Sequence, residues 1–127
     1  MKILLLAIIC FLAFNNIVAQ GGKAEPKRIK FDAGKSSSTL TGTLANGVEM
    51  EYVFSATEGQ TVTIRNSKTS LFDFRVFNEE HGVETEFESS ATLSLVIPAT
   101  GDYFLFVRKK QVRTPRTARF AVTLAIK

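Results

Sequence analysis

The chain has 127 residues, of which 45% are hydrophobic and 22% charged, with 16 Lys and Arg against 12 Asp and Glu. A chain of this length forms one domain. Because it has one His and one Cys, it cannot build a multi-His metal site, a Cys/His zinc cluster or a disulfide framework. Its 11 Phe and 2 Tyr residues favour a packed β-sheet over a disordered chain.

The N-terminus has the layout of a secretory signal peptide. Lys2 gives a positive start, residues 3–14 form a continuous apolar run, and the small Ala19 follows. The run is shorter than the roughly 20 apolar residues that a transmembrane helix needs, so we predict export to the periplasm or beyond, without stable membrane insertion. Cleavage after Ala19 is favoured over cleavage after Gly21, and either removes Cys10.

Apolar and polar residues alternate along most of the remaining chain, as they do in half-buried strands. The clearest alternation covers residues 48–56. Asn46-Gly47 stands just before it, and with residues 40–44 further back it predicts a hairpin. Residues 103–107 are apolar on both faces, which predicts a central strand. Further strands are expected at residues 29–32, 61–65, 71–77, 84–87, 92–97 and 120–126.

This pattern predicts an all-β fold, an antiparallel β-sandwich of about eight short strands with turn signals roughly every eight to twelve residues. We expect residues 1–19 to be the signal peptide, residues 20–27 a flexible N-terminal arm, and residues 28–127 a single β-sandwich domain.

Acidic residues gather in one part of the chain. Residues 79–88 contain five glutamates and no Lys or Arg. Glu84, Glu86 and Glu88 alternate, so a strand there would present three carboxylates on one face. The pattern favours a solvated edge strand, because the chain has no calcium-loop motif. Metal binding by these three glutamates is the alternative that the sequence leaves open.

Basic residues gather in another part. The segment between residues 108 and 119 has no acid and lies between two strongly apolar strands. Its length and Pro115 predict an extended, protruding loop. Such a loop can solubilise the protein, or can meet a polyanionic glycan, a membrane surface or a carboxylate-lined cleft on a partner protein. Nucleic acid is disfavoured, because the segment has no interleaved aromatic residues. The cations are Arg108, Lys109, Lys110, Arg113, Arg116 and Arg119.

The sequence gives little support for catalysis. His81 stands next to a glycine among glutamates, with no Ser or Cys nucleophile and supporting base nearby. Nothing sets the separation of a carboxylate pair for glycoside hydrolysis. We therefore expect His81 to be an exposed turn residue, and the protein to be neither an enzyme nor dependent on a cofactor or metal.

Several short motifs occur in an informative order. They are Gly42-Thr43-Leu44, residues 51–56 (EYVFSA), 58–62 (EGQTV), 72–76 (FDFRV) and 98–107 (PATGDYFLFV), then the basic segment and residues 120–126 (FAVTLAI). This series, spanning residues 31–127, resembles the bacterial periplasmic inhibitors of g-type and i-type lysozymes. Parts of it also resemble the pre-peptidase C-terminal β-sandwich domains of secreted proteases.

The resemblance to the inhibitors implies a secreted, non-enzymatic protein that inserts a loop into the active-site cleft of a lysozyme. The family's Ser-Gly-x-Tyr loop falls on Thr100 to Tyr103, with Thr in place of Ser, and its Arg-rich loop falls on residues 108–116. The partner is then a lysozyme, and a homodimer stays open. The implied partner-binding residues are Thr100, Gly101, Asp102, Tyr103, Arg108, Lys109, Arg113 and Arg116.

Two alternatives remain. Residues 98–102 can be an ordinary turn, with Tyr103 packed into the sandwich and its hydroxyl bonded to a backbone carbonyl. The whole chain can also be a stand-alone module of the pre-peptidase type that binds cell-wall glycan or an envelope protein.

Overall fold

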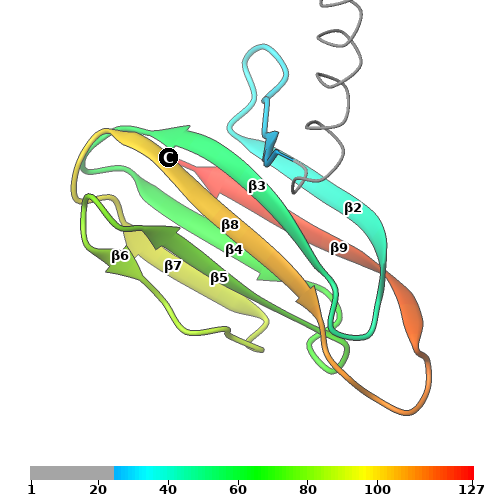
Figure 1. Cartoon of the computed structure of the whole chain (residues 1–127). Helices are drawn as coiled ribbons and strands as arrows, with labels where there is room; N and C mark the ends of the chain where they lie inside the picture. The colour runs from blue at the N-terminus through cyan, green and yellow to red at the C-terminus, as the bar shows by residue number, and fades with distance from the viewer. Residues whose placement is uncertain (1–24) are drawn as a thin grey trace, which may run out of the picture.

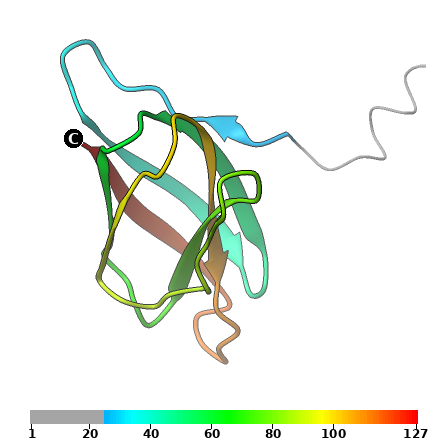
Figure 2. The same cartoon turned by 90° about the vertical axis from the view of Figure 1, so that its left-hand side faces the viewer.

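The computed structural model describes residues 25–127, so the expected signal peptide at residues 1–19 lies outside the described residues. Within the described part, two sheets pack face to face, which confirms the predicted all-β sandwich (Figures 1 and 2). Residues 25–127 contain no helix that is long and apolar enough to cross a membrane. The strands are β1 (Lys27–Arg28), β2 (Ser37–Ala45), β3 (Glu49–Ala56), β4 (Thr61–Asn66), β5 (Phe72–Asn78), β6 (Val83–Glu84), β7 (Thr92–Val96), β8 (Gly101–Lys109) and β9 (Thr117–Ile126).

The two sheets have different strand orders. The five-stranded sheet runs β1-β3-β8-β5-β6 and the four-stranded sheet runs β2-β9-β4-β7. All pairs are antiparallel except β1 with β3. Strand β8 pairs on both sides, with β3 and β5, so the prediction that residues 103–107 form a central strand is confirmed.

Aromatic side chains between the sheets dominate the core. Phe54 stacks on Tyr103 within the five-stranded sheet, with ring centroids 5.9 Å apart. The ring of Phe72 meets Phe120 of the opposite sheet edge-on at 5.7 Å. Gly42 makes room for this contact, because a Cβ there would lie 2.9 Å from the Phe120 ring. Phe54, Phe72, Tyr103 and Phe120 are fully buried, and the contact between Phe72 and Phe120 joins the two sheets.

The predicted hairpin around Asn46-Gly47 is wrong. The turn itself forms: the N–H of Val48 donates to the carbonyl of Ala45, and Gly47 has a φ of 77°. However, β2 pairs with β9 and β3 pairs with β8, so the turn carries the chain from one sheet to the other. A tight turn sets where the chain reverses, whereas the long-range partners decide which sheet each strand joins.

Two other strand predictions need correction. Residues 29–32 do not form a strand; pairing occurs at β1, and the N–H of Ile29 extends it with a bond to Val53 O. Residues 84–87 contribute only the end of β6, because the chain leaves the sheet after Glu84 and rejoins it through an isolated bridge between Glu88 and Phe74. The three alternating glutamates therefore do not share one sheet face.

Candidate functional site

Strand β8 separates the predicted partner-binding residues into two groups. Thr100 to Tyr103 lie where β8 begins, and the basic segment starts where it ends (Figure 1). Nine residues of extended chain place the two groups about 26 Å apart. The structure therefore does not bring all eight predicted residues into one site.

Tyr103, at the beginning of β8, is a core residue. Its side chain is fully buried and its hydroxyl donates a hydrogen bond to the backbone carbonyl of Ala99. This geometry agrees with the alternative that residues 98–102 form an ordinary turn, with the Tyr103 hydroxyl bonded to a backbone carbonyl of that turn. A group held in this way has no surface to offer a partner.

Hydrogen bonds and close packing also hold Thr100 and Gly101. The Oγ1 atom of Thr100 accepts a hydrogen bond from the N–H of Glu58 at 2.9 Å. The His81 ring lies against Gly101, where a Cβ would come within 3.2 Å of Nε2. The expectation of an exposed histidine is wrong, because its side chain is 24% exposed and its ring lies 6.1 Å from that of Tyr103.

Asp102 forms an ion pair within the chain. Its carboxylate accepts hydrogen bonds from both terminal nitrogens of Arg28, at 3.2 and 2.7 Å, and from the Ser55 hydroxyl at 2.8 Å. The hydrogen bond from Arg28 lowers the pKa of Asp102, with a further contribution from Ser55. The beginning of β8 thus satisfies most of its own polar groups.

The first two cations at the other end of β8 are also committed to the fold. The guanidinium of Arg108 donates to both carboxylate oxygens of Asp73, at 3.1 and 2.8 Å, and lies 3.7 Å from the centre of the Phe87 ring. These hydrogen bonds raise the pKa of Arg108. Arg108 is therefore part of the sheet surface rather than of the protruding loop.

Lys109, which the resemblance implies as a partner-binding residue, is not exposed in the structure. Lys109 is fully buried, because inward and outward positions alternate along β8 and position 109 points into the sandwich. Its Nζ donates to Asn46 Oδ1 at 2.7 Å and to the carbonyl of Lys110 at 2.9 Å. Lys109 instead anchors the base of the loop.

Asn46 connects the β2–β3 turn to the β8–β9 loop, residues 110–116. Besides accepting from Lys109, its side chain donates to Val112 O at 2.7 Å, and its N–H donates to Arg116 O at 2.9 Å. The sequence did not predict that Asn46 would hold this loop, because the Asn46-Gly47 pair indicates only a turn. Asn46, from the β2–β3 turn, therefore fixes the base of the β8–β9 loop.

Arg113 and Arg116 are the exposed cations of this loop. No hydrogen bond or ion pair of either side chain occurs within residues 25–127. Together with Asn46, Gln111 and Val112 they line a hollow of about 420 Å³ at the loop's base. Guanidinium groups in such a position can bind a carboxylate or phosphate through two parallel hydrogen bonds.

Glu84, Glu86 and Glu88 do not form a metal site in the structure. No group of three or more His, Cys, Asp or Glu side chains in residues 25–127 is arranged to hold a metal ion. Glu84 instead lies 3.5 Å from the guanidinium of Arg75, whose side chain contacts the rings of Phe77, Phe87 and Phe106.

The chain matches no protein-family profile and no curated protein sequence. Its fold matches that of PliG, a periplasmic inhibitor of g-type lysozyme. The Aeromonas hydrophila protein aligns with a TM-score of 0.66 and 20% identity, over 80% of this chain and 96% of its own. The Salmonella Typhimurium protein gives 0.66 and 22% over 83% and 100%, and a mutant of the Escherichia coli protein gives 0.62 and 25% over 83% and 100%.

A second type of solved structure also matches. The pre-peptidase C-terminal domain of a Bacillus anthracis collagenase aligns with a TM-score of 0.53 and 16% identity, over 84% of this chain and 98% of its own. Both resemblances expected from the motifs are confirmed at the level of fold. The chain has the β-sandwich found in periplasmic lysozyme inhibitors and in a pre-peptidase C-terminal domain.

Proposed function

We propose that this chain is a non-enzymatic protein inhibitor of a lysozyme, and that Arg113 and Arg116 on the β8–β9 loop enter the active-site cleft. The observation that carries the proposal is the contrast between these two exposed guanidiniums and the internally bonded groups of residues 100–103. The fold shared with the PliG inhibitors supports the choice of a lysozyme as the partner.

The chemistry of the target favours arginine. Glycoside hydrolases of this kind place acidic side chains in a cleft, and one of them is often a carboxylic acid with a raised pKa. A guanidinium that reaches this acid makes charge-assisted hydrogen bonds in a site with little water. The fixed base formed by Asn46 and Lys109 reduces the entropy lost when the loop binds.

A turbidity assay of cell-wall lysis tests this proposal. The mature protein is titrated against g-type, i-type and c-type lysozymes, alongside Arg113→Ala, Arg116→Ala and the double variant. Loss of a buried charged contact at an interface costs about 2 kcal/mol, or roughly thirtyfold in affinity. We expect at least one single variant to reach this loss without a change in Tm. Arg→Lys at the same position should recover only part of it, because lysine cannot form the bidentate contact.

The matched control lies at the opposite end of β8. Thr100→Ala removes the hydroxyl of the Ser-Gly-x-Tyr-like loop and should leave inhibition unchanged. If the double arginine variant inhibits like the parent while Thr100→Ala loses inhibition, the beginning of β8, and not the β8–β9 loop, enters the cleft. If no lysozyme is inhibited by the folded protein, the proposal fails, and a glycan-binding or envelope-protein-binding module of the pre-peptidase type becomes the better interpretation.

We further propose that the protein reaches the periplasm or the medium through cleavage of residues 1–19. Intact-mass measurement of the protein from periplasmic and culture fractions should give a chain that starts at Gln20. A chain that keeps its N-terminal residues in these fractions would contradict the proposal.

A further inference from the structure

The outer face of the four-stranded sheet differs from the rest of the surface. Its outward positions are mostly Ser and Thr, with three cations, three alanines and one valine. On β2 and β9 they are Ser37, Thr39, Thr41, Thr43, Ala45, Thr117, Arg119, Ala121, Thr123, Ala125 and the adjoining Lys127; on β4 and β7 they are Thr61, Thr63, Arg65, Thr92, Ser94 and Val96.

Strand register places the hydroxyl groups in rows across the sheet. Ser37, Ala125, Thr63 and Ser94 are successive cross-strand partners. The Oγ atoms of Thr63 and Ser94 lie 3.2 Å apart, within hydrogen-bond distance. Each hydroxyl can both donate and accept, so the face offers donors and acceptors at a regular spacing set by the sheet.

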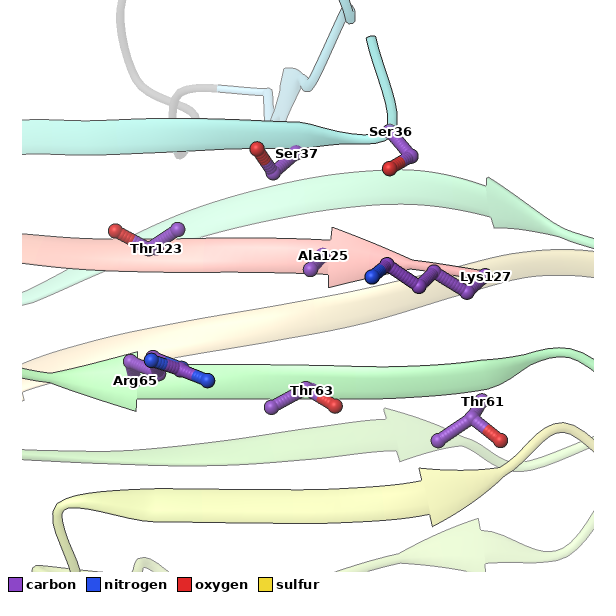
Figure 3. A pocket seen from close by; sticks show the side chains of 8 residues that line it. All are labelled: Ser36, Ser37, Thr61, Thr63, Arg65, Thr123, Ala125 and Lys127. Atoms are coloured by element: carbon purple, nitrogen blue, oxygen red, sulfur yellow. The ribbon is translucent and has the colours of Figure 1, made fainter.

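A hollow of about 520 Å³ lies on this face, lined by Ser36, Ser37, Thr61, Thr63, Arg65, Thr123, Ala125 and Lys127. In Figure 3, Ala125 lies near the middle of the hollow, Arg65 lies on one side of it, and the side chain of Lys127 reaches toward it from the other. Lys127 pairs with Thr61 through two backbone hydrogen bonds. Because Arg65 lies four positions after Thr61 on β4, the backbones of the two cationic residues are about 13 Å apart.

The charge of the face has one sign. All 12 acidic residues of the chain lie outside its outward positions. Asp32 and Glu58, in the turns before β2 and β4, are near in sequence but do not line the hollow. The side chains of Arg65 and Lys127 have no hydrogen bond or ion pair with any residue from 25 to 127.

We propose that this hollow binds an anionic polysaccharide whose sugar units carry carboxylates. The Ser and Thr hydroxyls would bond the ring hydroxyls, and Arg65 and Lys127 would bind carboxylates of nearby units. The volume lies within the range of small-ligand sites, about 300–1,000 Å³. A protein partner fits less well, because the outward positions of this sheet have no aromatic anchor.

This inference does not depend on the proposed inhibitor function, because the hollow and the β8–β9 loop are built from different residues. Affinity electrophoresis and calorimetry with three probes test it without any lysozyme. We expect polygalacturonate to bind. Fully methyl-esterified pectin has the same backbone with its carboxylates masked, and we expect its affinity to be lower by about tenfold or more. Equal binding of polyglutamate and polygalacturonate would overturn the proposal, since it would show attraction to charge alone.

Two pairs of variants locate the site. In the first pair, the double variants Arg65→Ser/Lys127→Ser and Arg113→Ser/Arg116→Ser each remove two positive charges. Only the Arg65→Ser/Lys127→Ser variant should weaken polygalacturonate binding tenfold or more. Ala125→Phe should block the hollow, whereas Ala121→Phe, on the same strand and face but outside the lining, should bind like the parent. Equal losses within either pair would contradict the assignment. Lysozyme inhibition should be unchanged in Arg65→Ser/Lys127→Ser.

Discussion

The two ends of strand β8 carry the Ser-Gly-x-Tyr-like motif and the basic segment, and they differ in how their polar groups are used. At its beginning, Thr100, Asp102 and Tyr103 bond to other parts of the same chain. At its end, the loop holds Arg113 and Arg116 exposed above a base fixed by Asn46. A family-like motif does not by itself make a binding surface, because a group can bind a partner only if the fold leaves it available.

The fixed base matters as much as the exposed tip. Arg108 and Lys109 have the same charge as Arg113 and Arg116, but they are paired or buried. Arg108 thus belongs to the sheet surface and Lys109 to the base of the loop, whereas Arg113 and Arg116 are exposed. We expect substitutions at the base of the loop to have the largest effect.

Lys109→Ala should destabilise the protein most. The change removes hydrogen bonds to Asn46 Oδ1 and Lys110 O and leaves a cavity at a fully buried position. We expect the free energy of unfolding in urea to fall by about 2–4 kcal/mol. Inhibition by the fraction that stays folded should also fall, because Asn46 loses one of its bonds.

Lys109→Met provides the matched comparison, since it keeps most of the volume and removes only the charge and its hydrogen bonds. We expect its stability to lie between those of the parent and Lys109→Ala. Lys110→Ala, which removes a bond to Thr69 O from a half-buried side chain, should cost less than either. A Lys109→Ala protein as stable as the parent would show that the loop has another anchor.

Tyr103→Phe tests the other end with a smaller change. It removes the hydroxyl that donates to Ala99 O and keeps the ring stacked on Phe54. The expected loss is about 1 kcal/mol of unfolding free energy, with inhibition unchanged at temperatures where both proteins are folded. A large loss of inhibition at unchanged stability would instead place the beginning of β8 in the partner's cleft.

The strands were easier to predict than the site. Alternation along β3, β4, β5, β7 and β9 reports which side of each strand faces the core, and that depends on local sequence. The exchange of sheets at Asn46-Gly47 could not be predicted in this way, because it depends on pairing with β8 and β9, which lie about 60 to 70 residues away.

For the proposed site, the sequence identifies the basic residues but does not show which of them the fold leaves exposed. Arg113 and Arg116 stand out in the sequence because no acid accompanies them. Lys109 has the same appearance and is buried, which follows only when the inward and outward positions of β8 are known. The roles of Asn46 and Arg28 depend on contacts between distant segments, and no local pattern signals them.

Asp102→Asn should give the smallest effect, and its dependence on pH identifies the cause. The Arg28 hydrogen bond lowers the pKa of Asp102 in the folded state, below its ordinary value of about 3.9. The ionised form therefore favours folding at neutral pH, and this contribution is lost as pH falls through the lowered pKa. The two side chains are 45% and 51% exposed, so solvent weakens the pair.

We expect Asp102→Asn to lower Tm slightly at pH 7, and the difference from the parent to shrink as the pH approaches 3. High salt at pH 7 should reduce the same difference by screening the pair. A difference that persists at pH 3 and in high salt would mean that the Ser55 hydrogen bond and local packing, rather than the charge, hold Asp102 in place. In either case inhibition should stay at the parent's level, because this end of β8 already satisfies its own polar groups.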